Sequence, residues 1–394
     1  MKKKLLSLYI HIPFCVRKCN YCDFLSAPAD EAAKEAYIQV LLLEIESYRG
    51  TQLSMRKVKT IFIGGGTPSI LDADRITDIL NKIKSVFYLT GDCEISMEMN
   101  PGTVTKEKIK RYLNAGINRI SIGLQTPDDN LLKVLGRVHT FEEFLHTYDE
   151  VREAGFQNVN IDLMAALPGQ SIEGYCNDLE KVTRLSPEHI SAYSLIVEEG
   201  TPFYDMYHSR CDLFPDEQAD REMYECTKEI LGRNGYMRYE ISNYAKEGYE
   251  CRHNIVYWEC EDYLGLGLGS ASLIDDIRFK NVCDLKQYIQ KWKAGEGYKV
   301  QRQEEEVLAV SAQMEEFIFL GLRMMRGVSK EEFTMRFGQS LEQIYGIQIE
   351  KLIRQGLLRW RTEEKKSMDR CGVRLALTDR GIDVSNYVFE QFLL

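Results

Sequence analysis

The first part of the chain alternates short strands with helices, and this alternation restricts the possible folds more than any other feature. Short β-branched runs end in Gly, Pro or Asn, and a helical pattern follows each run. The pattern predicts six strands, over Leu8–Ile12, Thr60–Ile63, Glu94–Met99, Arg119–Leu124, Val159–Met164 and His189–Leu195. It predicts helices near residues 31–48, 72–87, 105–115, 141–154, 171–185 and 216–234. Strands and helices in this order form a parallel sheet with right-handed crossovers.

Six strand–helix units are too few for a closed eight-stranded barrel. We therefore expect an α/β fold with an open, partial (β/α)6 barrel over residues 1–235. A flat, doubly wound sheet has the same alternation, and periodicity alone does not separate the two.

The pattern changes after residue 235. We expect a connecting region over residues 236–303, with a strand at Tyr239–Tyr244 and a glycine-rich segment at Tyr263–Ser272.

A further domain is expected over residues 304–394, where helix signals precede a strand pair, Leu357–Arg361 and Val373–Leu377. A polar hairpin at Glu363–Arg370 separates these strands. Helices followed by a two-stranded wing predict a winged-helix-like α+β domain.

Charge and composition exclude several classes of function. The chain has 394 residues and a formal net charge of −10, so a general nucleic-acid-binding surface is not expected. No run reaches the ~18 apolar residues of a membrane span, and no cleavable signal is recognised. A cytoplasmic location is expected, and the odd number of cysteines, 11, argues against a disulfide framework. The eight cysteines outside the N-terminal group are expected to be buried apolar side chains or surface thiols.

The cysteines Cys15, Cys19 and Cys22 follow the first strand in a Cys-x3-Cys-x2-Cys pattern. Iron–sulfur clusters are held by cysteine thiolates, usually four. Three thiolates would leave one iron of a 4Fe–4S cluster open, and that iron can chelate the amino and carboxylate groups of a methionine. A structural zinc site is the alternative, with His11 as the nearby fourth ligand.

A glycine turn, Gly64-Gly65-Gly66-Thr67-Pro68, follows the second strand. Such a turn lets backbone N–H groups approach a ligand, although a tight strand–helix connection needs the same residues. Ligands gather at the C-terminal ends of parallel barrel strands, which favours a binding role.

Polar residues also occur within or after the later strands, namely Glu98, Gln125, Arg137 and Asp162. Polar groups in apolar strands are costly to bury unless they are paired or bind a ligand. An internal salt bridge between Arg137 and Asp162 is the alternative to a binding site.

The cysteine motif after a first strand resembles the signature of the radical S-adenosylmethionine superfamily. The run Tyr9-Ile-His-Ile-Pro-Phe-Cys15 resembles more specifically the oxygen-independent coproporphyrinogen III oxidases. The resemblance covers essentially the whole chain and implies a cluster that binds S-adenosylmethionine and reduces its sulfonium. It also implies that the methionine amino group is received by the glycine turn.

The resemblance further implies which residues contact cofactor molecules. Those that match a first S-adenosylmethionine site are Tyr9, Gly65 and Glu98. Those that match a second site are Tyr21, Gly66, Thr67, Gln125, Arg137 and Asp162.

Two departures separate the chain from the oxidases. Asp23 and Phe24 follow Cys22 where the oxidases carry a further cysteine, and the oxidases have a longer segment before the cluster loop. Both departures match the sister family, heme chaperones of the HemW type. The segment Arg252–Trp258 contains His-Asn-x2-Tyr-Trp, which resembles a motif of that family.

His253 in this motif is a candidate heme ligand, because neutral histidine binds heme iron. A core histidine satisfied by hydrogen bonds is the alternative.

We expect a heme chaperone that carries a 4Fe–4S cluster and S-adenosylmethionine, binds heme, and passes it to an acceptor protein. A membrane-associated acceptor is one option, and reduction of the cluster implies an electron-donor protein. The alternative is an enzyme, a coproporphyrinogen III oxidase that converts propionates to vinyl groups.

Overall fold

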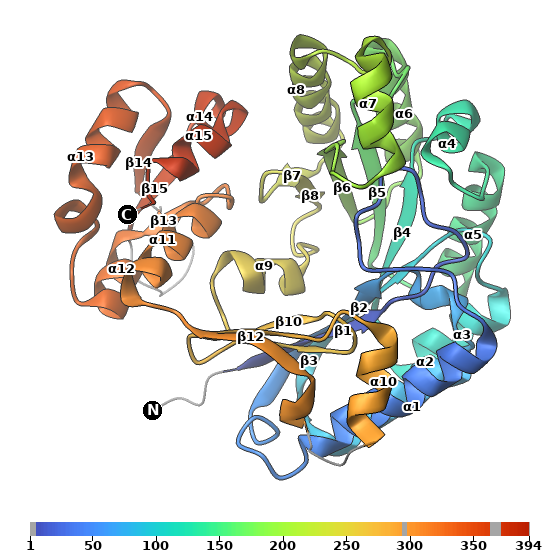
Figure 1. Ribbon diagram of the computed structural model, residues 1–394. Coiled ribbons are helices and arrows are strands. Elements are labelled where there is room, and N and C mark those ends of the chain that lie inside the picture. Colours follow the sequence, from blue (N-terminus) through green and yellow to red (C-terminus); the bar gives the residue numbers. More distant parts are fainter. Residues whose placement is uncertain (1–4, 294–297, 363–371, 394) are drawn as a thin grey trace. The chain divides into compact units, whose positions relative to one another are not determined.

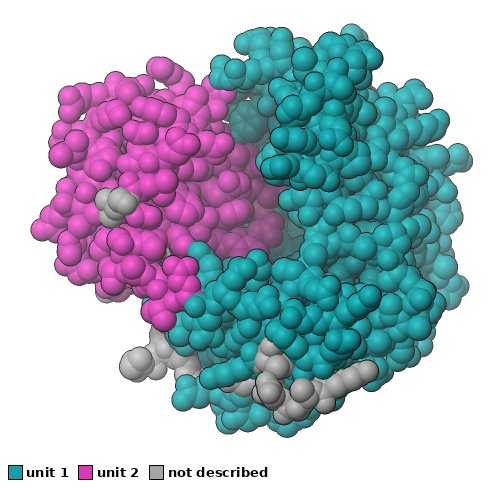
Figure 2. Space-filling view, in the orientation of Figure 1, with its two compact units in different colours: residues 1–237, 244–253, 262–305 teal, residues 238–243, 254–261, 306–394 magenta. Residues whose placement is uncertain are grey.

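The computed structural model describes residues 5–293, 298–362 and 372–393. It divides into two compact units, coloured teal and magenta in Figure 2. The first comprises residues 1–237, 244–253 and 262–305, and the second comprises residues 238–243, 254–261 and 306–394. The predicted hairpin Glu363–Arg370 lies outside the described residues.

Six parallel strands in sequence order form the centre of a large sheet that is open at both ends (Figure 1). They are β1 (Leu6–Ile12), β2 (Lys57–Gly65), β3 (Tyr88–Met99), β4 (Arg119–Gln125), β5 (Val159–Ala165) and β6 (His189–Ser194). Their registers pair Ile12 with Gly65 and Asp162 with Ser191. The sheet does not close on itself, because β1 and β6 do not pair with one another, as a partial barrel requires.

The predicted helices follow these strands in the chain (Figure 1). They are α1 (Glu31–Ser47), α2 (Ala73–Val86), α3 (Lys106–Ala115), α5 (Phe141–Ala154), α6 (Ile172–Arg184) and α8 (Glu217–Arg233). Helix α1 packs on α2, α2 on α3, α3 on α5, and α6 on α8. Ser171 caps α6 by accepting a hydrogen bond from Gly174 N, and Gly116 and Gly155 end their helices in the left-handed conformation. Within the predicted barrel region, residues 1–235, the structure adds two short α-helices that were not predicted, α4 (Asp129–Leu135) and α7 (Pro202–Arg210).

Additional strands extend the sheet beyond β1, because β9 (Tyr263–Leu266) from the glycine-rich segment pairs with β1 in parallel. The sheet continues through β10 (Ala271–Ile274), β11 (Ile277–Asn281) and β12 (Arg302–Val307). Helix α10 (Leu285–Lys293) follows β11 and packs beside α1.

The predicted strand Tyr239–Tyr244 is wrong. The structure has two short strands there, β7 (Met237–Arg238) and β8 (Asn243–Ala245), joined by a turn. The Glu240 carboxylate stabilises this turn, since it accepts hydrogen bonds from Ser242 N at 2.9 Å and from the Asn243 amide at 2.5 Å.

The second unit contains the predicted winged-helix-like arrangement. A three-stranded antiparallel sheet has the order β13-β15-β14, and the predicted strand pair is confirmed as β14 (Leu358–Thr362) and β15 (Val373–Leu377). The other elements are α11 (Val310–Gly321), β13 (Val328–Ser329), α12 (Lys330–Phe337), α13 (Leu341–Arg354), α14 (Asp379–Asp383) and α15 (Ser385–Glu390). Helix α9 (Arg252–Trp258) carries the His-Asn-x2-Tyr-Trp motif.

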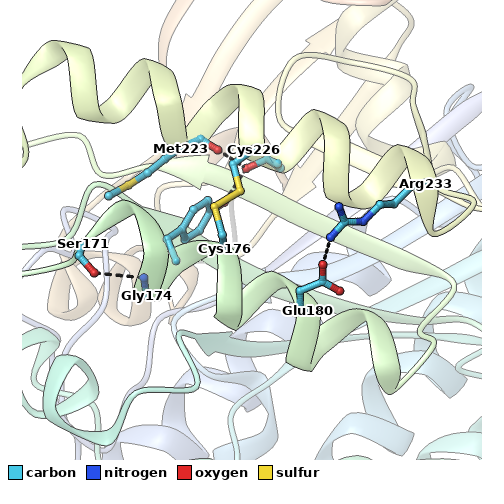
Figure 3. The surroundings of a disulfide bond; sticks show 9 residues. Ser171, Gly174, Cys176, Glu180, Met223, Cys226 and Arg233 are labelled. Carbon is cyan, nitrogen blue, oxygen red and sulfur yellow. Dashed lines mark hydrogen bonds and ion pairs between the residues drawn. A yellow bond between two sulfur atoms is a disulfide. The ribbon is translucent and has the colours of Figure 1, made fainter.

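A disulfide joins Cys176 on α6 to Cys226 on α8 (Figure 3). The expectation that these cysteines are unpaired is therefore wrong. The two helices pack side by side, which brings the two Cα atoms to 6.3 Å, within the range that a disulfide requires. Sequence spacing gave no indication of this pairing, because 50 residues separate the two cysteines.

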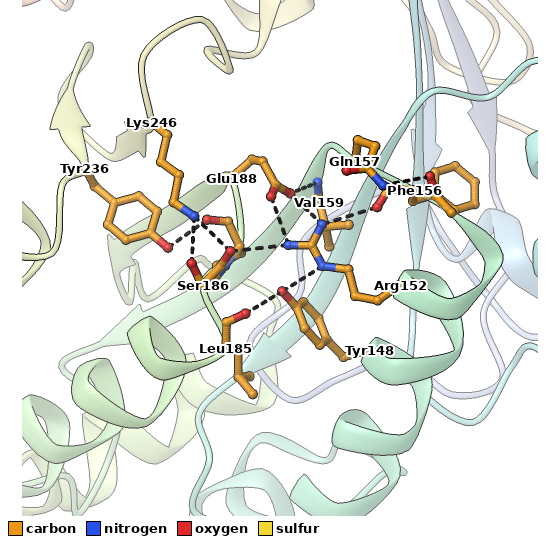
Figure 4. A network of polar contacts seen from close by, with 12 residues as sticks. Tyr148, Arg152, Phe156, Gln157, Val159, Leu185, Ser186, Glu188, Tyr236 and Lys246 are labelled. Carbon is orange, nitrogen blue, oxygen red and sulfur yellow. Dashed lines mark hydrogen bonds and ion pairs between the residues drawn. The ribbon is translucent and has the colours of Figure 1, made fainter.

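A polar network ties together the N-terminal ends of β5 and β6 (Figure 4). The guanidinium of Arg152 on α5 donates two hydrogen bonds to the Glu188 carboxylate, at 2.8 and 3.0 Å, and Glu188 also accepts from Val159 N at 3.0 Å. Lys246 donates to the carbonyl and hydroxyl of Ser186. The network fixes the connection into β6 from three parts of the chain.

Among the helices that the structure describes, none is both long and apolar enough to cross a membrane.

Candidate functional site

The three candidate cluster ligands lie in the irregular loop that follows β1. Backbone hydrogen bonds hold this loop, from Cys15 N to Ala27 O at 3.2 Å and from Asn20 N to Leu135 O at 2.9 Å. Cys15, Cys19 and Cys22 are free and partly exposed. The loop is thus fixed at both ends while its thiols remain accessible.

Each thiol has a distinct environment. The Thr67 hydroxyl donates to Cys15 Sγ at 3.5 Å, and Arg137 donates to Cys19 Sγ at 3.8 Å. Burial raises the pKa of the Cys22 thiol. Among the described residues, no three His, Cys, Asp or Glu side chains are gathered as ligands of one metal ion. A cluster differs from a single ion because each thiolate binds its own iron, so the sulfurs stand further apart.

The glycine turn ends β2 against the cluster loop. A Cβ on Gly65, whose φ is +114°, would lie 2.5 Å from the His11 ring, and one on Gly66 would lie 2.6 Å from Phe14 O. Only glycine therefore allows this close approach.

The N–H groups of this turn bond within the chain, from Gly65 to Glu98 Oε2, from Gly66 to Ile12 O and from Thr67 to Phe14 O. The expectation that these N–H groups face a ligand is wrong, because they hold the cluster loop and Glu98.

Glu98 and Tyr9 lie on neighbouring parts of the barrel interior. Burial, and after it the nearby Asp162 carboxylate, raise the pKa of Glu98 to about 8. Burial also raises the pKa of Tyr9 well above its ordinary value, with Glu98 as the second cause. The Tyr9 hydroxyl is hydrogen-bonded to His11 Nδ1 at 3.0 Å. A cationic ligand group beside the Glu98 and Asp162 carboxylates would be stabilised by them and would offset the cost of burying their charge.

Gln125 ends β4 in a strained backbone conformation. Its φ is +74°, and the pairing of β4 with β5 shifts register between Gly123 and Gln125. A non-glycine residue in this region is uncommon and often marks a functional site. The Tyr193 hydroxyl donates to Gln125 Oε1 at 3.4 Å.

Arg137 faces the cluster loop and does not pair with Asp162. Its NH2 group donates to Asn100 Oδ1 at 2.7 Å and to Gly123 O at 2.6 Å. Asp162 instead accepts hydrogen bonds from Ser121 at 2.9 Å and from Asn160 at 2.7 Å. The predicted salt bridge is therefore wrong, because neighbouring hydroxyl and amide groups satisfy Asp162. Tyr21 lies close to Arg137, and burial raises the pKa of its hydroxyl.

Asn100 was missed by the sequence analysis. It directly follows β3, and its amide donates to Thr67 Oγ1 at 2.8 Å while its carbonyl oxygen accepts from Arg137. A polar residue immediately after a strand was the available signal. With Thr67, Arg137 and Cys19 it lines a cavity of about 20 Å³ beside the cluster loop.

His253 is buried, with 1% of its surface exposed. Its Nδ1 is hydrogen-bonded to Thr60 at 2.8 Å, its ring stacks on Phe62 at 5.2 Å, and its backbone N–H donates to the Glu94 carboxylate at 3.1 Å. Burial lowers the pKa of His253 to about 3. These contacts match the core-histidine alternative, and heme ligation by His253 stays a prediction.

The fold and the cysteine loop define the class of protein. Residues 9–182 match the radical SAM superfamily model, and residues 308–363 match the HemN C-terminal domain model. The structure is similar to that of coproporphyrinogen III oxidase HemN from Escherichia coli, a radical SAM enzyme. That likeness has a TM-score of 0.83, 22% identity, and coverage of 99% of this chain and 90% of that one. The shared architecture confirms the predicted fold class.

Whole-length similarity gives the particular family. The chain is 40% identical to heme chaperone HemW of Lactococcus lactis, over 100% of this chain and 99% of that protein. It is 38% identical to HemW of Bacillus subtilis, over 98% and 99% of the two chains. HemW of Escherichia coli is 36% identical over 98% of each chain. The chain therefore belongs to the HemW family of radical SAM proteins.

Membership of the radical SAM superfamily implies a 4Fe–4S cluster and S-adenosylmethionine as cofactors. The residues fit both groups. Three free thiols share one anchored loop. The glycine turn packs against that loop and is hydrogen-bonded to Glu98. Soft thiolates suit iron, and buried acceptors suit a cationic ligand.

Proposed function

We propose that this protein is a heme chaperone, which binds heme and passes it to an acceptor protein. The observation that carries the proposal is its 36–40% identity, over at least 98% of its length, to three proteins named heme chaperones. The cysteine loop and the barrel-end residues add a site for the cofactors of the superfamily.

For the cluster, Cys15, Cys19 and Cys22 are the proposed ligands. Their thiolates would hold three irons, and the cluster would supply one-electron chemistry when bound. The backbone hydrogen bonds of the loop to Ala27 and Leu135 would keep the ligands in place when the cluster is absent.

For S-adenosylmethionine, Tyr9, Gly65 and Glu98 are the proposed contacts of a first molecule. The amino group of the methionine carries N–H donors, so acceptor groups must receive it. Carbonyl oxygens of the glycine turn and the Glu98 carboxylate supply this chemistry, since the turn's N–H groups are already used. We propose a second set of contacts, formed by Tyr21, Gly66, Thr67, Gln125, Arg137 and Asp162. Asn100 would position Thr67 and Arg137 within it.

An electron-donor protein, a membrane-associated heme acceptor and a cytoplasmic location belong to the same proposal. The first follows from the reduction that the cluster needs, and the second from the apolar nature of heme. The cytoplasmic location is the third part of this proposal. We also propose the division into a barrel at 1–235, a connecting region at 236–303 and a terminal domain at 304–394.

One anaerobic preparation with reconstituted cluster tests the function. It is divided between a heme titration followed by absorbance and a coproporphyrinogen turnover assay with a verified electron donor. We expect saturable heme binding and no vinyl product. Robust vinyl formation would make the protein an oxidase, and absence of heme binding would overturn the chaperone proposal.

A further inference from the structure

The second unit contains a cavity of about 280 Å³ that is separate from the cysteine loop. Helices α9, α11 and α12 and strand β15 supply its lining. Aromatic rings and thioethers form its apolar part, from Trp258, Phe317, Met324 and Met335. Met335 is 74% exposed, whereas Met324 is buried. The cavity therefore offers flat and polarisable apolar surface that remains accessible from solvent.

An unsatisfied donor lies in this lining. The indole Nε1 of Trp258 is buried and has no hydrogen-bond partner. Arg323 lies over the indole ring, with its guanidinium carbon 4.4 Å from the ring centroid. A buried donor without a partner is costly, and it indicates an acceptor that the chain itself does not provide.

Charged groups of both signs surround the apolar part. The lining includes three arginines, Arg326, Arg336 and Arg374, and three glutamates, Glu259, Glu261 and Glu332. Glu259 forms an ion pair with Arg326. Arg336 on α12 and Arg374 on β15 bring further guanidinium groups, which suit carboxylates as hydrogen-bond acceptors.

We propose that this cavity is the heme-binding site, and the proposal rests on the chaperone function argued above. The macrocycle would lie against Trp258 and Phe317, and its propionates would accept hydrogen bonds from the indole N–H and from Arg336. Met335 would be an axial iron ligand, because thioether sulfur is a known heme ligand. None of the six histidines of the chain belongs to this unit, so the unit itself offers no histidine as an axial iron ligand.

The volume of the cavity is consistent with a site that holds heme and then passes it to an acceptor protein. Sites that enclose small ligands measure ~300–1,000 Å³, and this one lies at the lower limit. A heme would therefore enter in part and keep one edge exposed. An exposed edge is what an acceptor protein needs to take the ligand.

Heme titration of four variants tests this site, with ferric absorption spectra recorded at each point. Met335→Leu removes only the thioether at nearly constant volume, Arg336→Ala removes one guanidinium, and Trp258→Phe removes the indole N–H. Arg354→Ala is the matched control, because Arg354 is an exposed arginine of the same unit that pairs with Glu350. Thermal unfolding of each variant verifies that it is folded.

We expect Met335→Leu to shift the Soret band and abolish the methionine–iron charge-transfer band. Arg336→Ala should weaken heme binding roughly tenfold, as the loss of one charge-assisted hydrogen bond predicts. Arg354→Ala should leave both the heme affinity and the absorption spectrum unchanged. If wild type binds heme and the three cavity variants bind it with unchanged affinity and spectrum, the cavity assignment is overturned and the chaperone function stands.

His253→Ala separates the remaining cases. Loss of the wild-type heme spectrum in folded His253→Ala, with Met335→Leu unaffected, would overturn the cavity assignment in favour of the motif histidine. If wild type itself binds no heme, the chaperone function fails and this proposal fails with it.

Discussion

The guanidinium of Arg137 lies 3.8 Å from the sulfur of Cys19, although 118 residues separate them in the chain. Arg137 follows β4 and α4, whereas Cys19 follows β1. Burial would lower the pKa of Arg137, but Tyr21 and Cys19 more than offset this, and the pKa is raised. A permanent positive charge is therefore held against one of the three proposed cluster ligands.

Replacing Arg137 with Gln should make the cluster harder to reduce. Loss of a buried positive charge disfavours the added electron, and a shift of about −60 mV would correspond to a tenfold change for a one-electron couple. An EPR-monitored redox titration of reconstituted protein measures it. Arg137→Lys keeps the charge and should restore most of the potential. Equal potentials in wild type and Arg137→Gln would show that the charge does not act on the cluster.

Glu98 should make stability depend on pH. Its folded pKa of about 8 exceeds the ~4.3 of an unfolded glutamate. The contribution of Glu98 to the free energy of unfolding is therefore fully present below pH ~4.3 and is lost as pH rises through about 8. Glu98→Gln removes this loss. The free energy of unfolding of the variant, relative to that of wild type, should therefore increase by at least ~1 kcal/mol from pH 6 to pH 9.

Urea unfolding of cluster-free protein at both pH values gives this difference. The pKa of Asp162 is also raised by burial, so a smaller slope of the same sign should remain in the variant. Parallel pH profiles for wild type and Glu98→Gln would contradict the prediction.

The disulfide between Cys176 and Cys226 closes a loop of 50 residues. Cys226→Ala should lower the free energy of unfolding by ~2–4 kcal/mol, because the unfolded chain regains the freedom of that loop. A thiol reductant should lower the melting temperature of wild type and leave that of Cys226→Ala unchanged. Non-reducing peptide mapping should recover the two cysteines in one linked peptide, and their recovery as separate thiols would reject the bond.

Glu188 should be a stabilising residue of the barrel's N-terminal edge. Glu188→Gln weakens two hydrogen bonds from Arg152 in a partly buried site and should cost ~1–3 kcal/mol. Glu153→Gln is the control, since Glu153 pairs with Lys106 while 60% exposed, and such pairs contribute ~0–1 kcal/mol. Thermal unfolding compares them, and equal losses would mean that the network adds nothing beyond a surface ion pair.

The sequence predicted the six central strands and the main helices because each leaves a local signature. Alternation and capping residues such as Ser171 are properties of neighbouring positions, and the structure confirms them. The prediction of a strand over Tyr239–Tyr244 failed because the Glu240 carboxylate accepts hydrogen bonds from Ser242 N and the Asn243 amide, which stabilise a turn. Strand propensities do not account for such side-chain hydrogen bonds.

The candidate site was only partly predictable. Glu98 and Gln125 could be expected at one edge, since parallel strands end there together. That Asn100 joins Thr67 to Arg137, and that Arg137 avoids Asp162, depends on side-chain directions across different strands. Periodicity assigns a residue to an element and carries no information on its partner.

By itself, the sequence determined the order of strands and helices, the spacing of the three cysteines after the first strand and the placement of polar residues at strand ends. Only the tertiary structure decided that β9 pairs with β1, that Cys176 meets Cys226, and that His253 is enclosed by Thr60 and Phe62. The physical reason is distance along the chain. Local backbone preferences act between near neighbours, whereas these contacts form when packing brings together residues separated by 50 positions or more.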